Sequence, residues 1–458
     1  MMKQIIGIAL VCACMAFLAL SGCNEDPDAP RINDINLDPP GPVPTNSDVR
    51  VTADVDGSNL DYHWKVSGGI IRQSAAHVAQ ADHTPSIIVT EPGEDDVGQV
   101  LSDLRFAFTT VSTENLATVV GSLEQDIVFI NSSDTISTGI QDFAIRSFVE
   151  DGGTLYASGR AAEYIEWLWP EVLGLASPDP YVGSADTGEP VLSSKVTETH
   201  AAQALGFTDF DAHPPENPWP PILEVWPTGI STIVKSDASS MVNTELIENL
   251  PPGNDLTDIP MSCSFTRGDG FVVFTNLYYR SDMDADERAL TEYLVSLALM
   301  QPYIRTSRDL VNMAGYYPMG DWVGVVSEPG QRTFSIDLSD ADDVYFVLNS
   351  DSFVFKLTVE GPGDIEENIT GRTPISMAFP GVEDGTWTVT VAGTAEHSPY
   401  RVPFALTVGI KTDTQEMVTT EPEVIWRTPF EPDTYTITLR VIDDHFRADE
   451  FTVGLIVE

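Results

Sequence analysis

Positively charged side chains are scarce in this sequence. Its 458 residues include 23 Lys and Arg against 70 Asp and Glu, which gives a formal net charge of −47. Such a charge repels polyanions and anionic headgroups, so nucleic acid is excluded as a partner. Attachment of the protein to anionic lipid through a basic surface is excluded for the same reason. The acidic residues are dispersed along the chain, which fits either solubility in salty surroundings or calcium binding.

Cysteine and histidine are too sparse for the common disulfide and zinc sites. Cys12, Cys14 and Cys23 all lie within the first 23 residues, so Cys263 stands alone in the remaining chain and no intrachain disulfide is expected. Its apolar context, MSCSF, predicts a small buried residue. The seven histidines form no HxH or HExxH pair. The sequence therefore predicts no cofactor and no metal site, with calcium left open by the acidity.

The chain begins with a short apolar segment that ends at a cysteine. Lys3 precedes the apolar run Ile5–Leu20, and Leu20-Ser21-Gly22-Cys23 follows. This motif resembles the bacterial lipobox. The resemblance implies that residues 1–22 are a signal peptide and that Cys23 carries a diacylglycerol thioether and an acylated amino terminus. An uncut signal anchor is the alternative, although the run is short for a span of about 20 residues.

The residues after the cysteine bear on the destination of the chain. Residues 23–30 are polar and contain proline, as expected of a short tether. In lipoproteins that this motif resembles, an aspartate directly after the lipidated cysteine is the signal for retention in the inner membrane. Asn24 occupies that position here. The sequence thus predicts a cell-envelope lipoprotein, held through its lipid at the outer membrane, on its periplasmic or surface face.

The two ends of the folded part carry complementary strand patterns. Apolar and polar side chains alternate, as in strands, over residues 49–55 and Leu60–Val66, which flank an Asp-Gly turn. Two further alternating segments lie within Glu423–Glu458. With the Tyr62-x-Trp64 strand, residues 31–76 and 416–458 together resemble one PKD or immunoglobulin-like sandwich. Two separate partial domains are the alternative.

Between these halves, residues 77–304 alternate strands and helices. The apolar run Asp126–Asn131, a helix over Ile140–Glu150 and a strand over Thr154–Ala157 are typical of a doubly wound parallel sheet. Residues 305–411 are all-β and resemble the pre-peptidase C-terminal class of sandwich. The predicted fold class is thus multidomain α/β plus all-β, with the α/β domain and a β-sandwich inserted into an immunoglobulin-like β-sandwich.

The α/β segment resembles the class I glutamine amidotransferase-like superfamily, in particular its ThuA-like branches. The matching runs are DIVFI at 126–130 and FVEDGGTLYASG at 148–159. Catalytic members place a cysteine where Ser158 stands and a histidine after a later strand, which here ends FTNLYY. The expected catalytic Cys and His are absent, so the resemblance implies a fold more than an activity.

Ligands in such sheets bind at the carboxyl ends of the strands. A pocket there would be lined by four residues in the two loops that follow buried strands: Ser132, Asp134, Ser158 and Arg160. The sequence favours a non-catalytic binding or scaffold lipoprotein whose partner is an envelope protein or a glycan. The alternative is an extracytoplasmic hydrolase or degenerate amidotransferase-like enzyme that acts on carbohydrate or peptide material through this pocket.

Overall fold

The computed structural model describes residues 29–458 apart from 46, 58–59, 74–83, 94, 122–124, 133–139, 160, 171, 173–191, 213–229, 237–259, 278, 281–282, 340, 352, 364, 395–399, 412–414, 420–421, 429–431 and 444–446. The expected signal peptide and Cys23 lie outside this part of the chain. The chain divides into two compact units, one containing residues 1–75 and 412–458 and the other containing residues 76–411. Within the described residues, no helix is long and apolar enough to span a membrane.

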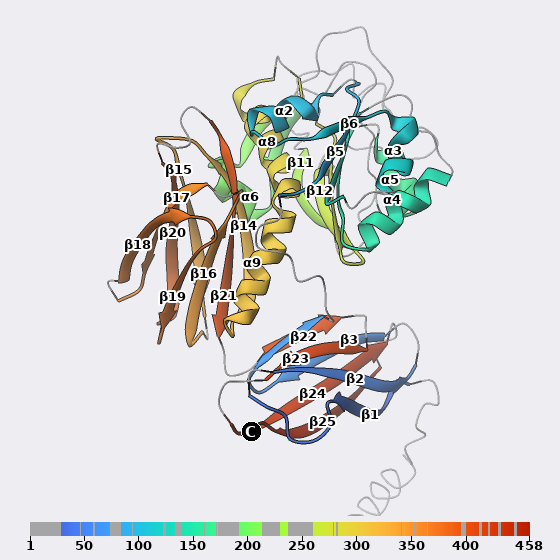
Figure 1. The fold of residues 1–458 in the computed structure, drawn as a ribbon, viewed down its shortest axis with the longest axis vertical. Helices are drawn as coiled ribbons and strands as arrows, with labels where there is room; N and C mark the ends of the chain where they lie inside the picture. The colour runs from blue at the N-terminus through green and yellow to red at the C-terminus, as the bar shows by residue number, and fades with distance from the viewer. Residues whose placement is uncertain are drawn as a thin grey trace, which may run out of the picture. The chain divides into compact units, whose positions relative to one another are not determined.

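The first unit is a pair of four-stranded sheets built from both ends of the chain (Figure 1). One sheet has the order β1-β2-β23-β4, and the other has the order β22-β3-β24-β25. The strands are β1 Arg31–Asp38, β2 Asp48–Asp56, β3 Leu60–Val66, β4 Ile70–Gln73, β22 Gln415–Thr419, β23 Glu423–Arg427, β24 Thr434–Asp443 and β25 Ala448–Ile456. Every pairing in the two sheets is antiparallel.

The core of this unit contains side chains from distant parts of the sequence. Trp64 on β3 and Trp426 on β23 are almost completely buried, and they join one apolar cluster with Val49, Val51 and Leu439. Alternation along β3 buries Leu60, Tyr62, Trp64 and Val66 on one face, as expected for a half-buried strand. Both tryptophans are therefore core residues.

The second unit contains a nine-stranded sheet in the order β10-β9-β11-β12-β13-β8-β7-β5-β6. The strands are β5 Ile87–Thr90, β6 Thr109–Val111, β7 Ile127–Ile130, β8 Thr154–Ser158, β9 Leu192–Val196, β10 Asp209–Ala212, β11 Ser231–Ser236, β12 Pro260–Arg267 and β13 Gly270–Thr275. The part from β13 to β6 is parallel, whereas β12, β11, β9 and β10 extend it by antiparallel pairing.

The prediction of a parallel sheet is correct for only part of this sheet. The continuous apolar strands β5, β7 and β8 are buried along their whole length, which is the pattern of parallel strands covered on both faces. The antiparallel half was missed because β12 and β13 form a hairpin across Gly268 and Asp269, and no helix separates them. The sheet is thus mixed.

Helices cover both faces of the mixed sheet. The helix α3 (Leu116–Val120) shares one apolar cluster with α4 (Ile140–Glu150) and α5 (Ala161–Leu168). The opposite face is covered by α2 (Val97–Asp103), α6 (Thr199–Leu205), α8 (Ala285–Leu299) and α9 (Gln301–Met313). Figure 1 shows α3, α4 and α5 on one side of the strands, with α8 on the other.

The rest of the second unit is a β-sandwich. Its sheets have the orders β14-β21-β16-β19 and β15-β20-β17-β18. The strands are β14 Tyr317–Val326, β15 Gln331–Leu338, β16 Asp343–Asn349, β17 Val354–Gly361, β18 Ile365–Arg372, β19 Ile375–Pro380, β20 Gly385–Gly393 and β21 Val402–Lys411. Aromatic side chains fill the space between the sheets, among them Phe346, Phe379 and Trp387, whose rings are in mutual contact.

The sandwich and the mixed sheet share one hydrophobic core. Helix α9 follows α8 after Met300 and packs against β14, β16 and β21, and α6 packs against β14 and β15. The expected domain boundary after residue 304 therefore falls inside α9. The reason is that Ile304 and Val311 are buried on this helix, so it belongs to the interface between the two layers.

Candidate functional site

The carboxyl edge of the parallel strands holds a buried polar network. Asn131, which follows β7, donates from Nδ2 to the Thr90 carbonyl at 2.8 Å and accepts from the Val97 backbone N–H at 2.9 Å. Its own N–H donates to Thr90 Oγ1 at 2.8 Å. Thr90 and Asn131 are both almost completely buried. This network fixes the entry of α2 relative to β5 and β7, because each buried polar group finds a partner.

Ser158 and Asp95 lie at the centre of this edge. Ser158, the last residue of β8, donates its hydroxyl hydrogen to Asp95 Oδ2, and Ser158 Oγ accepts from the Ser132 N–H at 3.1 Å. Asp95 Oδ1 accepts from the Tyr279 N–H at 2.9 Å. Burial raises the pKa of Asp95 to about 7, against the opposing effect of these hydrogen bonds.

The structure brings together part of the predicted pocket. Ser132 and Ser158 are hydrogen-bonded neighbours, and neither side chain is exposed at all. Asp134 and Arg160 lie outside the described residues. Asp95 is the partner that sequence reasoning missed, and its only signal was a pair of acids, Asp95 and Asp96, before a helix. Asp96 does cap α2 through Gln99, whereas the Asp95 side chain points inward to Ser158.

Two side chains considered for chemistry have other positions. Cys263 is completely buried on β12, and burial raises the pKa of its thiol well above the usual range, so it is a core residue as predicted. His200 lies in α6, where its ring is 4.5 Å from that of Trp322 on β14. Within the described part of the chain, Ser158 Oγ is hydrogen-bonded to groups of Asp95, Ser132 and Ile130, and none of these is a histidine.

A cavity of about 270 Å³ lies near the opposite, amino edge of the parallel strands. Its floor is formed by β11, β12 and the start of β13, and its roof by α8 and α9. The first turn of α6 and part of β14 form its walls. The lining includes eleven polar or charged side chains: Glu198, His200, Ser231, Ser264, Thr266, Asp269, Tyr293, Gln301, Arg305, Arg308 and Asp321.

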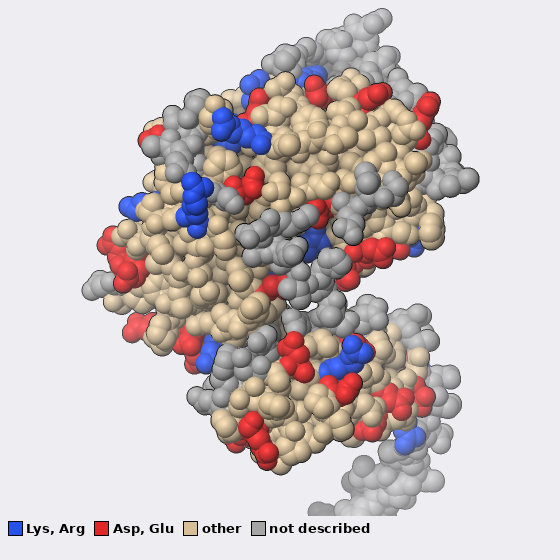
Figure 2. Space-filling model, viewed as in Figure 1, with Lys and Arg blue, Asp and Glu red and all other residues tan. Residues whose placement is uncertain are grey.

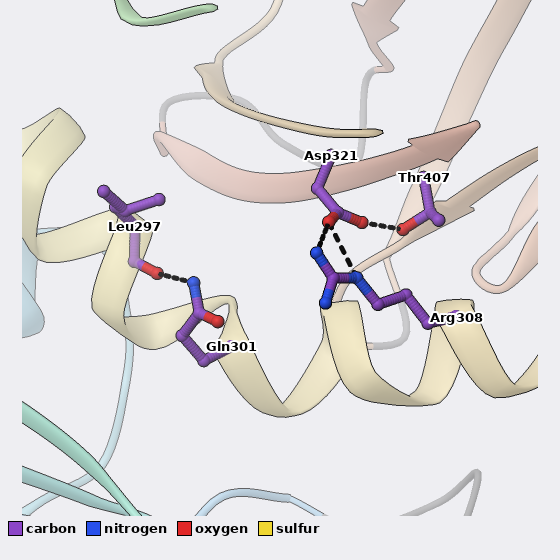
Figure 3. Close-up of polar contacts among 5 residues, drawn as sticks. All are labelled: Leu297, Gln301, Arg308, Asp321 and Thr407. Atoms are coloured by element: carbon purple, nitrogen blue, oxygen red, sulfur yellow. Dashed lines mark hydrogen bonds and ion pairs between the residues drawn. The ribbon is translucent and has the colours of Figure 1, made fainter. Parts of the chain in front are cut away.

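Most charges around this cavity are partnered within the chain. Arg308 on α9 donates from Nε to Asp321 Oδ2 at 2.9 Å, and Asp321 Oδ1 accepts from Thr407 Oγ1 at 2.7 Å (Figure 3). Arg305 donates to the carbonyl of Gly152. Burial lowers the pKa of Arg305, and the nearby carboxylates of Asp126 and Asp269 oppose this shift. Each guanidinium is therefore held in place by acceptors of its own chain.

The α6 wall of the cavity is also fixed by local contacts. Glu198 caps α6 by accepting from the backbone N–H groups of His200, at 3.0 Å, and Ala201. Trp322, buried against the core, supports the imidazole of His200. The residues around the cavity come from seven separate elements, so no local pattern in the sequence connects them. The one local signal was the row of small polar residues Ser262, Ser264 and Thr266 in a strand that is otherwise apolar.

Acidic groups do not gather into a metal site in the described part of the chain. No group of three or more His, Cys, Asp or Glu side chains is arranged to hold an ion there. Figure 2 shows acidic side chains scattered over the visible face of the molecule.

Comparisons with known proteins give only weak likenesses. No family model matches the sequence, and no curated protein matches it. Among solved structures, the chain is similar to a ThuA-like protein from Parabacteroides merdae, with 12% identity, a TM-score of 0.33, and coverage of 48% of this chain and 90% of that one. A cold-adapted beta-galactosidase from Rahnella sp. R3 gives 13% identity and a TM-score of 0.29 over 67% of this chain.

A third similar structure is a periplasmic inhibitor of g-type lysozyme from Aeromonas hydrophila. It gives 14% identity and a TM-score of 0.18 over 21% of this chain and 90% of that chain. The chain spans 41% of the length of the beta-galactosidase. These values are compatible with an α/β layer and sandwich-like sheets, and they assign no activity.

Proposed function

We propose that this chain is a lipid-anchored protein of the bacterial cell envelope that binds a ligand and presents its folded units without catalysing a reaction. The lipobox-like sequence ending at Cys23 supports the anchor. Asn24 directly after it supports the outer membrane as the destination. An envelope protein or a glycan is the partner that this position makes available.

The observation that carries the non-catalytic part is the burial of Ser158. A nucleophile has to contact its substrate, and it needs an adjacent base to be activated. The Ser158 hydroxyl has no exposed surface and is bonded to both Asp95 and Ser132. These contacts connect β8 to the segments after β7 and before α2, which is a structural role. The accessible cavity lies elsewhere, at the amino edge of the strands.

A hydrolase is the second candidate, and one observation favours it. A carboxylate lies within hydrogen-bond distance of Ser158 Oγ, as an activating base would. The pKa of Asp95, at about 7, would allow that carboxylate to accept a proton near neutral pH. Burial of the pair is the argument against this reading.

The finer architecture belongs to the same proposal. The split unit with Trp64 and Trp426 fits a PKD or immunoglobulin-like sandwich. The mixed sheet fits a ThuA-like member of the amidotransferase-like superfamily, and strands β14–β21 fit the pre-peptidase C-terminal class. In this arrangement the lipid on Cys23 directly precedes the split sandwich in the sequence.

The anchor is tested by expressing the chain with Cys23→Ala in a diderm host fed radiolabelled palmitate. The native chain should incorporate label and partition into detergent, and the variant should do neither. Cys263→Ala is the matched control, because this buried thiol is not a lipidation position. Labelling that persists in Cys23→Ala but disappears in Cys263→Ala would overturn the anchor assignment.

The non-catalytic assignment is tested with chromogenic esters and glycosides. The native protein, Ser158→Ala and the surface control Ser376→Ala should all show the same background turnover. Turnover by the native protein that Ser158→Ala removes and Ser376→Ala keeps would establish the hydrolase instead.

A further inference from the structure

The floor of the amino-edge cavity is polar, unlike the rest of the same sheet face. The same face of the sheet is apolar elsewhere, where Val273 and Tyr156 join the core under α8. In the cavity, Ser264 and Thr266 occupy alternate positions on β12, so both side chains point to one face. Ser231 lies opposite Ser264 in the β11–β12 register. Ser264 is buried, whereas Thr266 and Ser231 are exposed, so the polar side chains extend from the floor to the mouth of the cavity.

These hydroxyl groups are available for a ligand. The side-chain hydroxyl groups of Ser231, Ser264 and Thr266 form no hydrogen bond with any other described residue. Gln301 on α9 donates from Nε2 to the Leu297 carbonyl at 3.0 Å (Figure 3), which leaves its Oε1 as an acceptor. The cavity therefore presents groups that both donate and accept hydrogen bonds.

The charged residues around it favour a neutral ligand. Arg308 is engaged by Asp321, and both carboxylate oxygens of Glu198 accept backbone N–H groups. An ionised ligand gains most from an unpaired charge of the opposite sign, and breaking an existing buried pair is costly. A neutral ligand with several hydroxyl groups can bind beside these pairs without disrupting them.

Flat side chains complete the wall. The His200 ring is tilted by 34° against Trp322, with ring centroids 4.5 Å apart, and 39% of the His200 side chain is exposed. Such planar groups pack well against the C–H face of a sugar ring. The volume of about 270 Å³ accommodates a single small ring.

We propose that this cavity binds one neutral, polyhydroxylated ring, such as a monosaccharide unit, through Ser264, Thr266 and Gln301, with His200 against its face. The proposal rests on the proposed binding function and names the ligand class for it. The site is distinct from the carboxyl edge, where the sequence placed a pocket.

The test is calorimetric titration of the complete mature protein with galactose, N-acetylglucosamine and myo-inositol. Galacturonate, an anion, and the free amino acid alanine, a zwitterion, serve as ionised, charged probes. At least one neutral probe should bind, and the charged probes should bind more weakly or not at all. Thr266→Val, which removes one hydroxyl at nearly constant volume, should weaken binding about fivefold. Thr370→Val on the exposed strand β18 is the matched control and should bind as the native protein does.

Occlusion gives an independent readout. Ser264→Leu should fill the cavity and abolish binding, whereas Ser376→Leu on the surface should not. Binding of only galacturonate or alanine would overturn the ligand class, and unchanged sugar binding by Thr266→Val and Ser264→Leu would overturn the site. Absence of binding by every probe would also overturn the proposal. Each of these outcomes is separate from the palmitate and turnover assays, which test the anchor and the absence of catalysis.

Discussion

The hydroxyl of Ser158 donates a hydrogen bond to the carboxylate of Asp95, a residue 63 positions earlier in the sequence, and both side chains are almost wholly buried. The bond joins the end of β8 to the start of α2 across the carboxyl edge of the sheet. Asp95 also accepts from the Tyr279 N–H, so one carboxylate connects three segments. Burial raises the pKa of the Tyr156 hydroxyl, which has no hydrogen-bond partner among the described residues, and the nearby charge of Asp95 raises it further.

Asp95 should make the stability of the second unit depend on pH. Its pKa rises from 3.8 to about 7 on folding, so the folded state binds the proton more tightly than the unfolded state does. The stability gained from this proton is complete below pH 3.8 and is lost as the pH rises through about 7. The whole effect amounts to roughly 4 kcal/mol. Asp95→Asn cannot ionise, so above pH 7 its free energy of unfolding should exceed that of the native protein.

The measurement is urea unfolding of both proteins between pH 4 and 8. As the pH rises from 4 to 8, the free energy of unfolding of Asp95→Asn should increase relative to that of the native protein. Asp209→Asn, at an exposed position on β10, is the control and should follow the native curve. A constant difference at all pH values would show that Asp95 is ionised in the folded state throughout.

Glu292 and Arg401 should anchor the sandwich to the α/β layer. Arg401 Nη1 donates to Glu292 Oε1 at 3.0 Å, and the side chain of Glu292 on α8 is only 7% exposed. Burial raises the pKa of Glu292, and the Arg401 charge opposes that rise. Arg401→Met would remove the hydrogen-bonded ion-pair partner of a buried carboxylate, so we expect a loss of about 3 kcal/mol of stability at neutral pH.

Two further variants check this pair by chemical denaturation. Arg401→Met combined with Glu292→Gln should recover much of the loss, because the second change removes the buried charge. Arg146→Met breaks the exposed pair with Glu150 on α4 and should cost no more than about 1 kcal/mol. Equal losses for Arg401→Met and Arg146→Met would rule out an anchoring role.

The sequence was informative where a local pattern reflects burial. The strand predicted over Leu60–Val66 is β3, and the helix predicted over Ile140–Glu150 is α4, because alternation and helical spacing each expose one face to the core. The sequence also predicts a helix over Glu114–Leu123, and the structure has a 3-10 turn at Thr113–Asn115 followed by the shorter α3 there. Residues 122 and 123 of this predicted helix lie outside the described part of the chain.

The candidate sites were less accessible to sequence reasoning. Ser132 and Ser158 lie side by side in the structure, because parallel strands end at one edge of a sheet, whereas their role as a ligand pocket stays a prediction. The Asp95 contact depends on where a loop turns, and the cavity depends on how α6, α9 and β14 pack on the antiparallel strands. Neither leaves a periodic signal in the sequence, since each arises from residues that are distant along the chain.

Gly270 should be among the least replaceable residues of the mixed sheet. A Cβ atom at this position would lie 1.9 Å from the carbonyl oxygen of Val149 and 2.6 Å from that of Gly153. Backbone atoms cannot move aside as a flexible side chain can, so Gly270→Ala should destabilise the protein by about 3 kcal/mol. Gly371→Ala is the control, since the added atom would meet only Ile375, at 3.9 Å. Thermal unfolding should separate the two variants clearly.

The split unit should fold without the chain inserted into it. In the structure β3 pairs with β22 and β24, and β4 pairs with β23, so these two strands find all their neighbours in the C-terminal segment. Residues 29–73 joined to 415–458 by a flexible Gly-Ser linker should therefore give a β-rich circular dichroism spectrum and a cooperative unfolding transition. Residues 29–73 alone should not, because only the β1–β2 pair would remain.

Trp64 gives this experiment its internal check. The indole is 1% exposed and packs in the core between the two sheets, so Trp64→Ala in the joined chain should cost about 3 to 5 kcal/mol. Phe451→Ala removes an exposed ring on β25 and should cost much less. If residues 29–73 unfold cooperatively by themselves, the two ends are separate partial domains. If only the joined chain does so, the C-terminal strands complete the core that the N-terminal strands begin.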